Sequence, residues 1–474
     1  MGKEICVNYD QIFLLPPSPE DWVPKDHPAR FIRDFVESLD LRSLGFKESD
    51  SLDGRPPYSV DMLLKIWLYG YMNKIRSSRK LEGACLESMS LIWLTGAHYP
   101  DHNTLWRFWS VNRGALRAVF RQVVYVALKA DLVGLVLHAI DGTKIGADVS
   151  SGKVWRRGEL GQILTALDAS IEEVMEQIGK TEGMESGESR LPVEIQDSQR
   201  RREKIKEALA ELDRVDRDYL HPYDGDARLM KRGDNLGLAY NAQVAVDSES
   251  GLIVAETVVN DEADNRQLVP MIEEVKSNLS AVAQETVADA GYYSPGQLAE
   301  AETKGFSVMV SIPGEPDKRW GKGEFQKSNF IYDKERDVYV CPMGQNLTYD
   351  KTSRKSHGRY NIHLYRCCHY KECPRRCECS HRRGGRRIER GEHESAVEHQ
   401  RKKQKEPFKR ELLRKRKSIV EHIFAQIKQH QGLRRFSLRG LENVRTQWSM
   451  VCTVINLGKL HKLWATGSLV LEAS

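Results

Sequence analysis

Long hydrophobic runs are missing from this sequence. No stretch of the 474 residues approaches the ~20 consecutive apolar residues that cross a bilayer as a helix. The first residues, MGKEICVNYDQIFLLPP, also lack an apolar core of signal-peptide length. We therefore expect a cytoplasmic protein that has no membrane partner.

Cysteine is scarce outside one segment. Cys6, Cys85 and Cys452 lie alone, whereas six of the nine cysteines fall between Cys341 and Cys379. In a protein of the reducing cytosol, such clustering indicates metal ligation rather than disulfide bonds. The alternative is a set of reduced surface thiols.

A structural Zn²⁺ site is the expectation from this cluster, because Zn²⁺ takes four tetrahedral ligands. The four cysteines that we expect to complete it are Cys341, Cys368, Cys373 and Cys379. The spacing is irregular, so other residues remain alternatives as ligands, namely Cys367, Cys377, His369 and His381. A bound zinc would order a basic segment that has little core of its own.

Charge is distributed unevenly around the net value of +5. The segment from Lys351 to Gly440 holds 27 Lys and Arg against nine Asp and Glu, so the rest of the chain is acidic overall. A block this basic is either a solvated face or a contact for a polyanion. Interleaving with Cys, His and Tyr favours nucleic acid as the partner.

Residues 1–130 are predicted to be helical, because their apolar residues recur at spacings of three and four. Within them, Asn103 or Thr104 could cap a short helix, NTLWRFWSVN. Two short helices joined by a polar turn, with Arg107 on the second, fit a helix-turn-helix that binds DNA. A plain helical bundle with a tryptophan-rich core fits equally well.

From residue 131 the pattern changes to short apolar runs that alternate with helical segments, which predicts a mixed sheet flanked by helices. The predicted α/β core takes residues 131–158 and 219–315 and is completed by helices in 406–474. A helical hairpin (159–218) and a basic Cys-rich segment (316–405) are the predicted insertions.

Two aspartates follow apolar runs. Asp141 lies in LVLHAIDGT and Asp289 in ETVADAGYY, and each is followed by Gly within two residues. A rigid strand end is where a metal-binding carboxylate is best held. A single Asp here would more simply begin a turn. Two at corresponding strand ends favour a metal site.

Glu421 lies in the middle of a helix predicted over about 408–431, in KSIVEHIFAQIK. Lys428 follows about two turns later and so shares its face, with the small Ala425 between them. This arrangement suits a metal ligand beside a phosphate contact, although an isolated Glu here would be a surface residue. Two strand aspartates and a helix glutamate could together hold the two divalent ions of phosphodiester chemistry.

The segments HAIDGTKI, VADAGYYS and VEHIFAQIKQHQGLRRFSLRG, in this order, resemble the Asp-Asp-Glu (DDE) transposases of bacterial insertion sequences. DHNTLWRF is similar to the helix-turn-helix element of that family, and the segment from DGDARLM to NDEADNRQL is similar to its central hairpin and following helix. The resemblance covers most of the chain and implies a ribonuclease H-like fold for its core.

The resemblance also implies residue roles. Asp141, Asp289 and Glu421 match the triad that binds two Mg²⁺ ions, with Mn²⁺ as an alternative. Lys428 matches the lysine that contacts the transposon-end DNA. Asp224 and its neighbour Asp226 recur in the resemblance as a loop near the active site, without an assigned role.

The chain departs from the family pattern before Glu421. The pattern has a Tyr seven residues and an Arg four residues before the Glu, where this chain has Arg414 and Lys417, with Arg416 one place off. Lys can contact a phosphate, although without the bidentate geometry of Arg. The missing Tyr removes an auxiliary contact. We expect Lys428, Arg416, Lys417 and Arg107 to bind DNA.

The function implied is that of a DNA transposase, which cuts at terminal inverted repeats and joins the freed 3′-hydroxyls to target DNA. Two ends must be paired, so a homodimer is expected on double-stranded DNA. A catalytically inactive DNA-binding relative and a nuclease without strand transfer remain alternatives.

Overall fold

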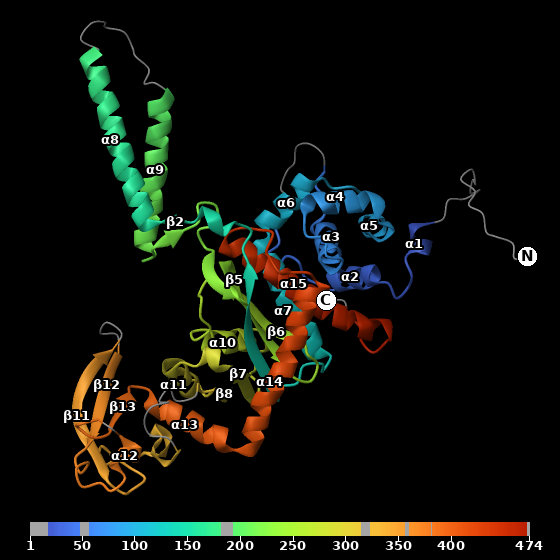
Figure 1. Cartoon of the computed structure of the whole chain (residues 1–474). Coiled ribbons are helices and arrows are strands. Elements are labelled where there is room, and N and C mark those ends of the chain that lie inside the picture. The colour runs from blue at the N-terminus through green and yellow to red at the C-terminus, as the bar shows by residue number, and fades with distance from the viewer. Residues whose placement is uncertain are drawn as a thin grey trace, which may run out of the picture.

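The computed structural model describes residues 18–47, 56–181, 193–313, 323–355, 360–380 and 382–471. It has a central α/β body with a group of N-terminal helices on one side (Figure 1). A helical hairpin and a small second sheet project from the body at two other places (Figure 1). None of the helices in the described ranges is long and apolar enough to cross a bilayer.

The N-terminal helices pack around an aromatic core. They are α1 (Pro19–Trp22), α2 (Pro28–Glu37), α3 (Val60–Met72), α4 (Ser78–Glu87), α5 (Met89–Thr95), α6 (His102–Val111) and α7 (Arg113–Lys129). The ring of Trp109 lies 4.7 Å from that of Trp67 and 5.6 Å from that of Tyr71, centroid to centroid. Trp109 is fully buried, whereas Trp106 stays 41% exposed on the outer face of α6.

Helix α6 begins earlier than predicted. Its N-cap is Asp101, whose Oδ1 accepts the backbone N–H of Thr104 at 2.7 Å. The expected cap at Asn103 or Thr104 was therefore wrong. A carboxylate one turn upstream satisfies the N–H that the first turn leaves free.

A six-stranded mixed sheet forms the centre of the body. Its strands are β1 (Leu137–Gly146), β4 (Arg228–Arg232), β5 (Asn235–Asp247), β6 (Ile253–Val259), β7 (Glu285–Ala288) and β8 (Val308–Val310). Across the sheet, β6 pairs with β5 and β5 with β1, both antiparallel. On the other side of β1 come β7 and then β8, both parallel to β1. Strand β4 pairs antiparallel with the start of β5. This confirms the predicted mixed α/β fold.

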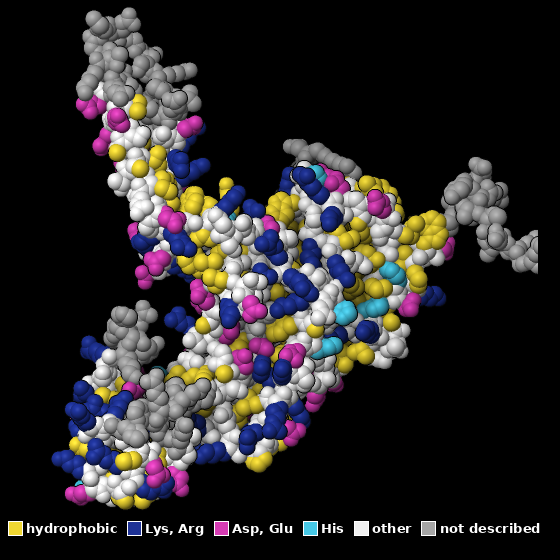
Figure 2. Space-filling model, in the orientation of Figure 1, with side chains coloured by type: hydrophobic (Ala, Val, Ile, Leu, Met, Phe, Trp, Pro, Cys, Tyr) yellow, Lys and Arg dark blue, Asp and Glu magenta, His cyan; other side chains and the backbone are white. Residues whose placement is uncertain are grey.

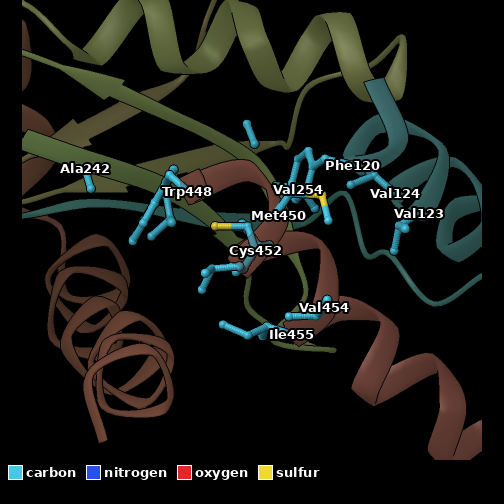
Figure 3. Packing of buried hydrophobic residues seen from close by; sticks show 14 of the residues in the cluster. Phe120, Val123, Val124, Ala242, Val254, Trp448, Met450, Cys452, Val454 and Ile455 are labelled. Atoms are coloured by element: carbon cyan, nitrogen blue, oxygen red, sulfur yellow. The ribbon is translucent and has the colours of Figure 1, made fainter. Parts of the chain in front are cut away.

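Helices cover the sheet. They are α10 (Leu268–Leu279), α11 (Pro295–Thr303), α13 (Glu394–Lys405), α14 (Pro407–Ala425) and α15 (Leu441–Ala465). Helix α15 packs against α7 and β6, and Figure 3 shows Trp448, Met450 and Ile455 of α15 among the buried side chains. The buried amide of Asn456 bonds to both the N–H and the carbonyl of Ile253 on β6. An apolar core with its polar atoms paired thus joins the N-terminal helices to the sheet.

The helical hairpin consists of α8 (Arg157–Thr181) and α9 (Val193–Arg214), which pack against each other and project from the body (Figure 1). A two-stranded pair, β2 (Trp155–Arg156) and β3 (Tyr219–Leu220), closes its base. Its buried apolar residues lie along one seam: Leu160, Ile205, Ala208 and Leu212.

The small sheet holds β9 (Ile331–Asp333), β10 (Val338–Val340), β11 (Asn346–Lys355), β12 (Tyr360–Cys367) and β13 (Arg387–Gly391), with the short helix α12 (Arg376–Cys379) beside it. All of its pairings are antiparallel. It has a separate aromatic core that includes Phe325, Tyr339 and Tyr365. Lys and Arg side chains are prominent on its surface (Figure 2). Helix α13, which follows it, packs against α11 and β8 and is also joined to the small sheet by the ion pair of Glu398 with Arg390 of β13.

Candidate active site

Asp141 and Asp289 lie level with each other on neighbouring strands. Strands β1 and β7 pair in parallel with Ala139 opposite Val287, so two further residues along each chain bring Asp141 beside Asp289. Asp289 comes directly after β7 and begins a short turn in which its Oδ1 accepts the N–H of Gly291 at 2.8 Å. The two aspartates therefore face the same end of the sheet.

Asp141 is not at a strand end, as the sequence had suggested. Strand β1 continues to Gly146, because residues after Asp141 remain paired with β5, Gly142 with Gln243 and Gly146 with Ala239. After Asp141 the strand continues as Gly-Thr-Lys-Ile-Gly, where polar residues and glycines break the apolar run although Thr143, Ile145 and Gly146 are buried.

Arg416 holds one oxygen of Asp141. Its Nη1 lies 2.8 Å from Asp141 Oδ2, while the Oδ1 of Asp141 accepts the N–H of Gly142. Burial raises the pKa of Asp141 to about 6, with Asp289 adding to the rise and Arg416 opposing it. The site is thus one in which a second positive charge would stabilise the ionised carboxylate.

Glu421 does not join the two aspartates in the described structure. Helix α14 packs against β1 and β7, but Glu421 comes 5 residues after Arg416, which turns it away from the Asp141 side of the helix. Its side chain is 62% exposed and its nearest cation is Lys417, at 3.7 Å. Among the described residues, no three His, Cys, Asp or Glu side chains are placed to hold a metal ion.

Helix α14 ends sooner than the predicted limit near residue 431. At Ala425 it passes into a π-helical turn, η6 (Gln426–His430), which changes the helical phase between Glu421 and Lys428. The prediction that these two residues share one face assumed an unbroken α-helix. Lys428 is half-buried and close enough to Asp141 for that carboxylate to affect its pKa.

A fourth carboxylate, that of Asp264, is absent from the sequence prediction and lies close to Asp289, since a Cβ on Gly291 would contact both side chains. Asp264 Oδ1 accepts from Lys144 Nζ at 3.1 Å, from the Asn241 amide at 2.6 Å and from the Gln243 amide at 2.8 Å. A side chain at Gly142 would collide with Gln243 and press on Asp264. This network fixes the strand beneath the site. The paired polar residues in NAQ, inside an apolar strand, were the signal that could have revealed it.

The other predicted DNA contacts are spread over the molecule. Arg107 is exposed on α6, at a cavity of about 550 Å³ that Tyr58 and Tyr99 also line. Lys417 is exposed on α14 beside Glu421. The Asp224 and Asp226 carboxylates accept backbone N–H groups at the start of α15, from Gly440 at 3.2 Å and Leu441 at 2.9 Å respectively. That motif caps a helix.

The cysteines of the small sheet are arranged differently from the predicted ligand set. Burial raises the pKa of the Cys379 thiol to about 11, and nearby Cys341, Cys373 and Cys367 add to the rise. Cys368 points elsewhere, with Sγ 3.3 Å from Thr348 Oγ1. His381 lies outside the described residues. The described residues therefore give the zinc prediction no support.

Two parts of the chain match known protein families. Residues 340–461 match a transposase DDE domain, and residues 17–110 match a transposase domain known as DUF772. The first match includes Glu421, Lys428 and most of the small sheet, and the second covers the helices up to α6. No curated protein matches the chain.

Proposed function

We propose that this chain, whose two domain matches identify it as a DDE transposase of insertion-sequence type, cuts the terminal inverted repeats of its element and transfers the 3′-hydroxyls to target DNA. The observation that carries the proposal is that Asp141 and Asp289 lie side by side, at the level set by the parallel pairing of β1 with β7, next to the helix that bears Glu421.

The catalytic residues in this proposal are Asp141, Asp289 and Glu421. Carboxylate oxygens are the ligands that Mg²⁺ and Mn²⁺ prefer, and the two strand aspartates fit that requirement. Two bound ions would activate the attacking water or hydroxyl and stabilise the leaving oxygen. Zinc has no part in this proposal.

DNA completes the site in this proposal. Asp141 and Glu421 are both paired with cations of α14, Arg416 and Lys417 respectively. A DNA backbone brought to α14 offers phosphates that compete for these two cations, and each carboxylate would then be free to bind metal. Glu421 must also turn toward the aspartates, and in this proposal α14 rotates about its own axis when the DNA binds.

The remaining parts are assigned by their charge and position. Residues 1–130 form the domain that reads the terminal repeats, with Arg107 on its exposed face. The core comprises 131–158, 219–315 and 406–474, and the basic segment 316–405 contributes phosphate contacts. Two copies of the chain pair the two ends. The helices of 159–218 are an insertion into this core.

The test is a cleavage assay with Mg²⁺ and linear DNA that carries the repeats flanking the gene. Asp141→Asn and Asp289→Asn should each reduce cleavage by at least about 10³-fold while DNA binding persists. Asp218→Asn is the matched control, since this aspartate precedes β3 at the base of the hairpin and its side chain is almost fully exposed. Full cleavage by either site variant would contradict the proposal.

The products separate the alternatives. Joined strand-transfer products indicate a transposase, whereas nicked or cut DNA without joining indicates a nuclease. Binding of the ends by the wild-type chain, without any cleavage in Mg²⁺ or Mn²⁺, would indicate an inactive relative.

A further inference from the structure

Three basic side chains from separate elements meet beside the proposed active site. They are Lys428 in η6, Arg232 at the end of β4 and Arg434 in the loop before α15. Arg232 and Arg434 are near enough to Lys428 to lower its pKa, although burial is the larger cause. Asp141 is the carboxylate that acts on Lys428 in the opposite direction.

The backbone holds this cluster in place. The Arg434 carbonyl accepts the N–H of Gly146 at 3.1 Å and Arg232 Nη2 at 3.1 Å, and Arg434 Nε points back to the Lys428 carbonyl at 3.4 Å. The Arg232 guanidinium lies over Gly146, where any Cβ would come within 2.5 Å of Nη1. The loop, the end of β1 and the end of β4 are therefore locked together around the three charges.

The cluster has no counter-ion within the part of the chain that the structure describes. None of Lys428, Arg232 and Arg434 lies within 4.0 Å of a carboxylate oxygen there. Arg439, five residues beyond Arg434 in the same loop, is by contrast paired with Asp148 at 3.3 Å. Cations gathered without an acid repel one another, and an anion bound among them relieves that repulsion.

We propose that Arg232 and Arg434 form, with Lys428, a binding site for a backbone phosphate of the DNA, next to Asp141. This inference rests on the proposed function and adds two residues to the DNA contact that the resemblance assigns to Lys428 alone. Guanidinium groups suit the task because they can contact phosphate oxygens in a bidentate way. The site positions the strand so that a neighbouring phosphodiester lies at the aspartates.

The test measures binding of a labelled duplex carrying the terminal repeat, with Ca²⁺ in place of Mg²⁺ so that the DNA is not cut. Arg232→Gln and Arg434→Gln should each weaken binding about five- to tenfold and reduce the slope of log affinity against log salt by about one. Arg439→Gln removes the same charge from the same loop, and should change affinity less than about twofold because that charge is already paired.

Two further measurements make the outcome decisive. Arg232→Lys keeps the charge but loses the bidentate contact, and should bind the duplex less tightly than the wild type and more tightly than Arg232→Gln, which separates charge from structure. Thermal unfolding identifies any variant that does not fold. If Arg232→Gln is such a variant, Arg434→Gln decides alone, since its side chain is exposed.

Gln variants that bind DNA like Arg439→Gln would overturn the phosphate site and leave the proposed function intact. A wild-type chain that fails to bind the terminal duplex would instead overturn the proposed function, and the phosphate site with it.

Discussion

The strand side and the helix side of the proposed active site hold their carboxylates in opposite ways. On the strands, Asp141 is largely buried and bonded to Arg416, and burial raises its pKa to about 6. On α14, Glu421 is mostly exposed and pairs only loosely with Lys417. The register of β1 against β7 sets the position of Asp141. The position of Glu421 depends instead on the face of α14 from which its side chain extends.

In the proposed function, this difference separates the part of the site that is in place before DNA binds, the two strand aspartates, from the part that DNA completes, Glu421. Backbone pairing places Asp141 and Asp289 at one level whether or not a ligand is present. Glu421 lacks such a constraint, and in the proposed function it enters the site only when α14 binds DNA. The strand half is preorganised and the helix half is conditional.

The largest effect is expected from Glu421→Gln. If DNA recruits this residue, the variant should lose at least about 10³-fold in cleavage rate, or about 4 kcal/mol of barrier, while stability stays unchanged because the side chain is exposed. Cleavage of the terminal-repeat duplex and thermal unfolding are the two measurements.

Lys417→Gln is the matched control for this prediction. It removes the partner of Glu421 without removing the carboxylate, and should change the cleavage rate less than about tenfold. Normal cleavage by Glu421→Gln would show that the two strand aspartates suffice, and the contrast between the two halves would lose its functional meaning.

An intermediate effect, on stability, is expected from removing the ion pair that joins the start of α14 to the sheet. Lys409, in its first turn, pairs with Glu285 of β7, whose side chain is 6% exposed. Lys409→Met leaves that carboxylate buried with Ser307 as its remaining side-chain donor, and should lower the free energy of unfolding by about 3 kcal/mol. Denaturant unfolding measures it.

The same helix offers the control for this anchor. Lys415 pairs with Glu411 at 3.3 Å, and both side chains are more than half exposed. Lys415→Met should therefore change stability by no more than about 0.5 kcal/mol. Equal effects at the two positions would mean that α14 is not fixed to the sheet through Lys409.

The sequence predicted the strand half of the site better than the helix half. An apolar run before Asp289 is a local signal, and the structure has a strand end there. The placement of Asp141 beside Asp289 follows from the register of β1 against β7, which no local sequence pattern contains. The mixed α/β fold followed from the alternation of apolar runs and helical segments.

The features that could not be predicted from the sequence depend on contacts between residues far apart in the chain. Arg416 was predicted to contact DNA, and nothing near it in the sequence indicates that it reaches Asp141. The π-helical turn that contains Lys428 is followed by a loop that bonds to β1 at Gly146, and helical periodicity in the sequence predicts neither feature. The network around Asp264 likewise joins three separate segments.

The smallest effect concerns Glu256, a half-buried carboxylate on β6. Burial raises the pKa of Glu256 on β6 to about 8, with Glu274 adding to the rise and Arg117 and Arg445 opposing it. An unfolded Glu titrates near 4.5. Between these values the unfolded chain releases a proton that the folded chain keeps, so this residue makes the protein less stable as pH rises from about 4.5 to about 8.

Glu256→Gln removes that titration. The variant should be about 1–2 kcal/mol more stable than the wild type at pH 8.5, a figure reduced because the side chain is half-buried, and nearly equal to it at pH 5. Thermal unfolding at the two pH values measures the difference, and Glu172→Gln on the exposed face of α8 should show none. A gain that did not depend on pH would mean that Glu256 is ionised in the folded protein. Burial would then not be what raises the pKa of Glu256.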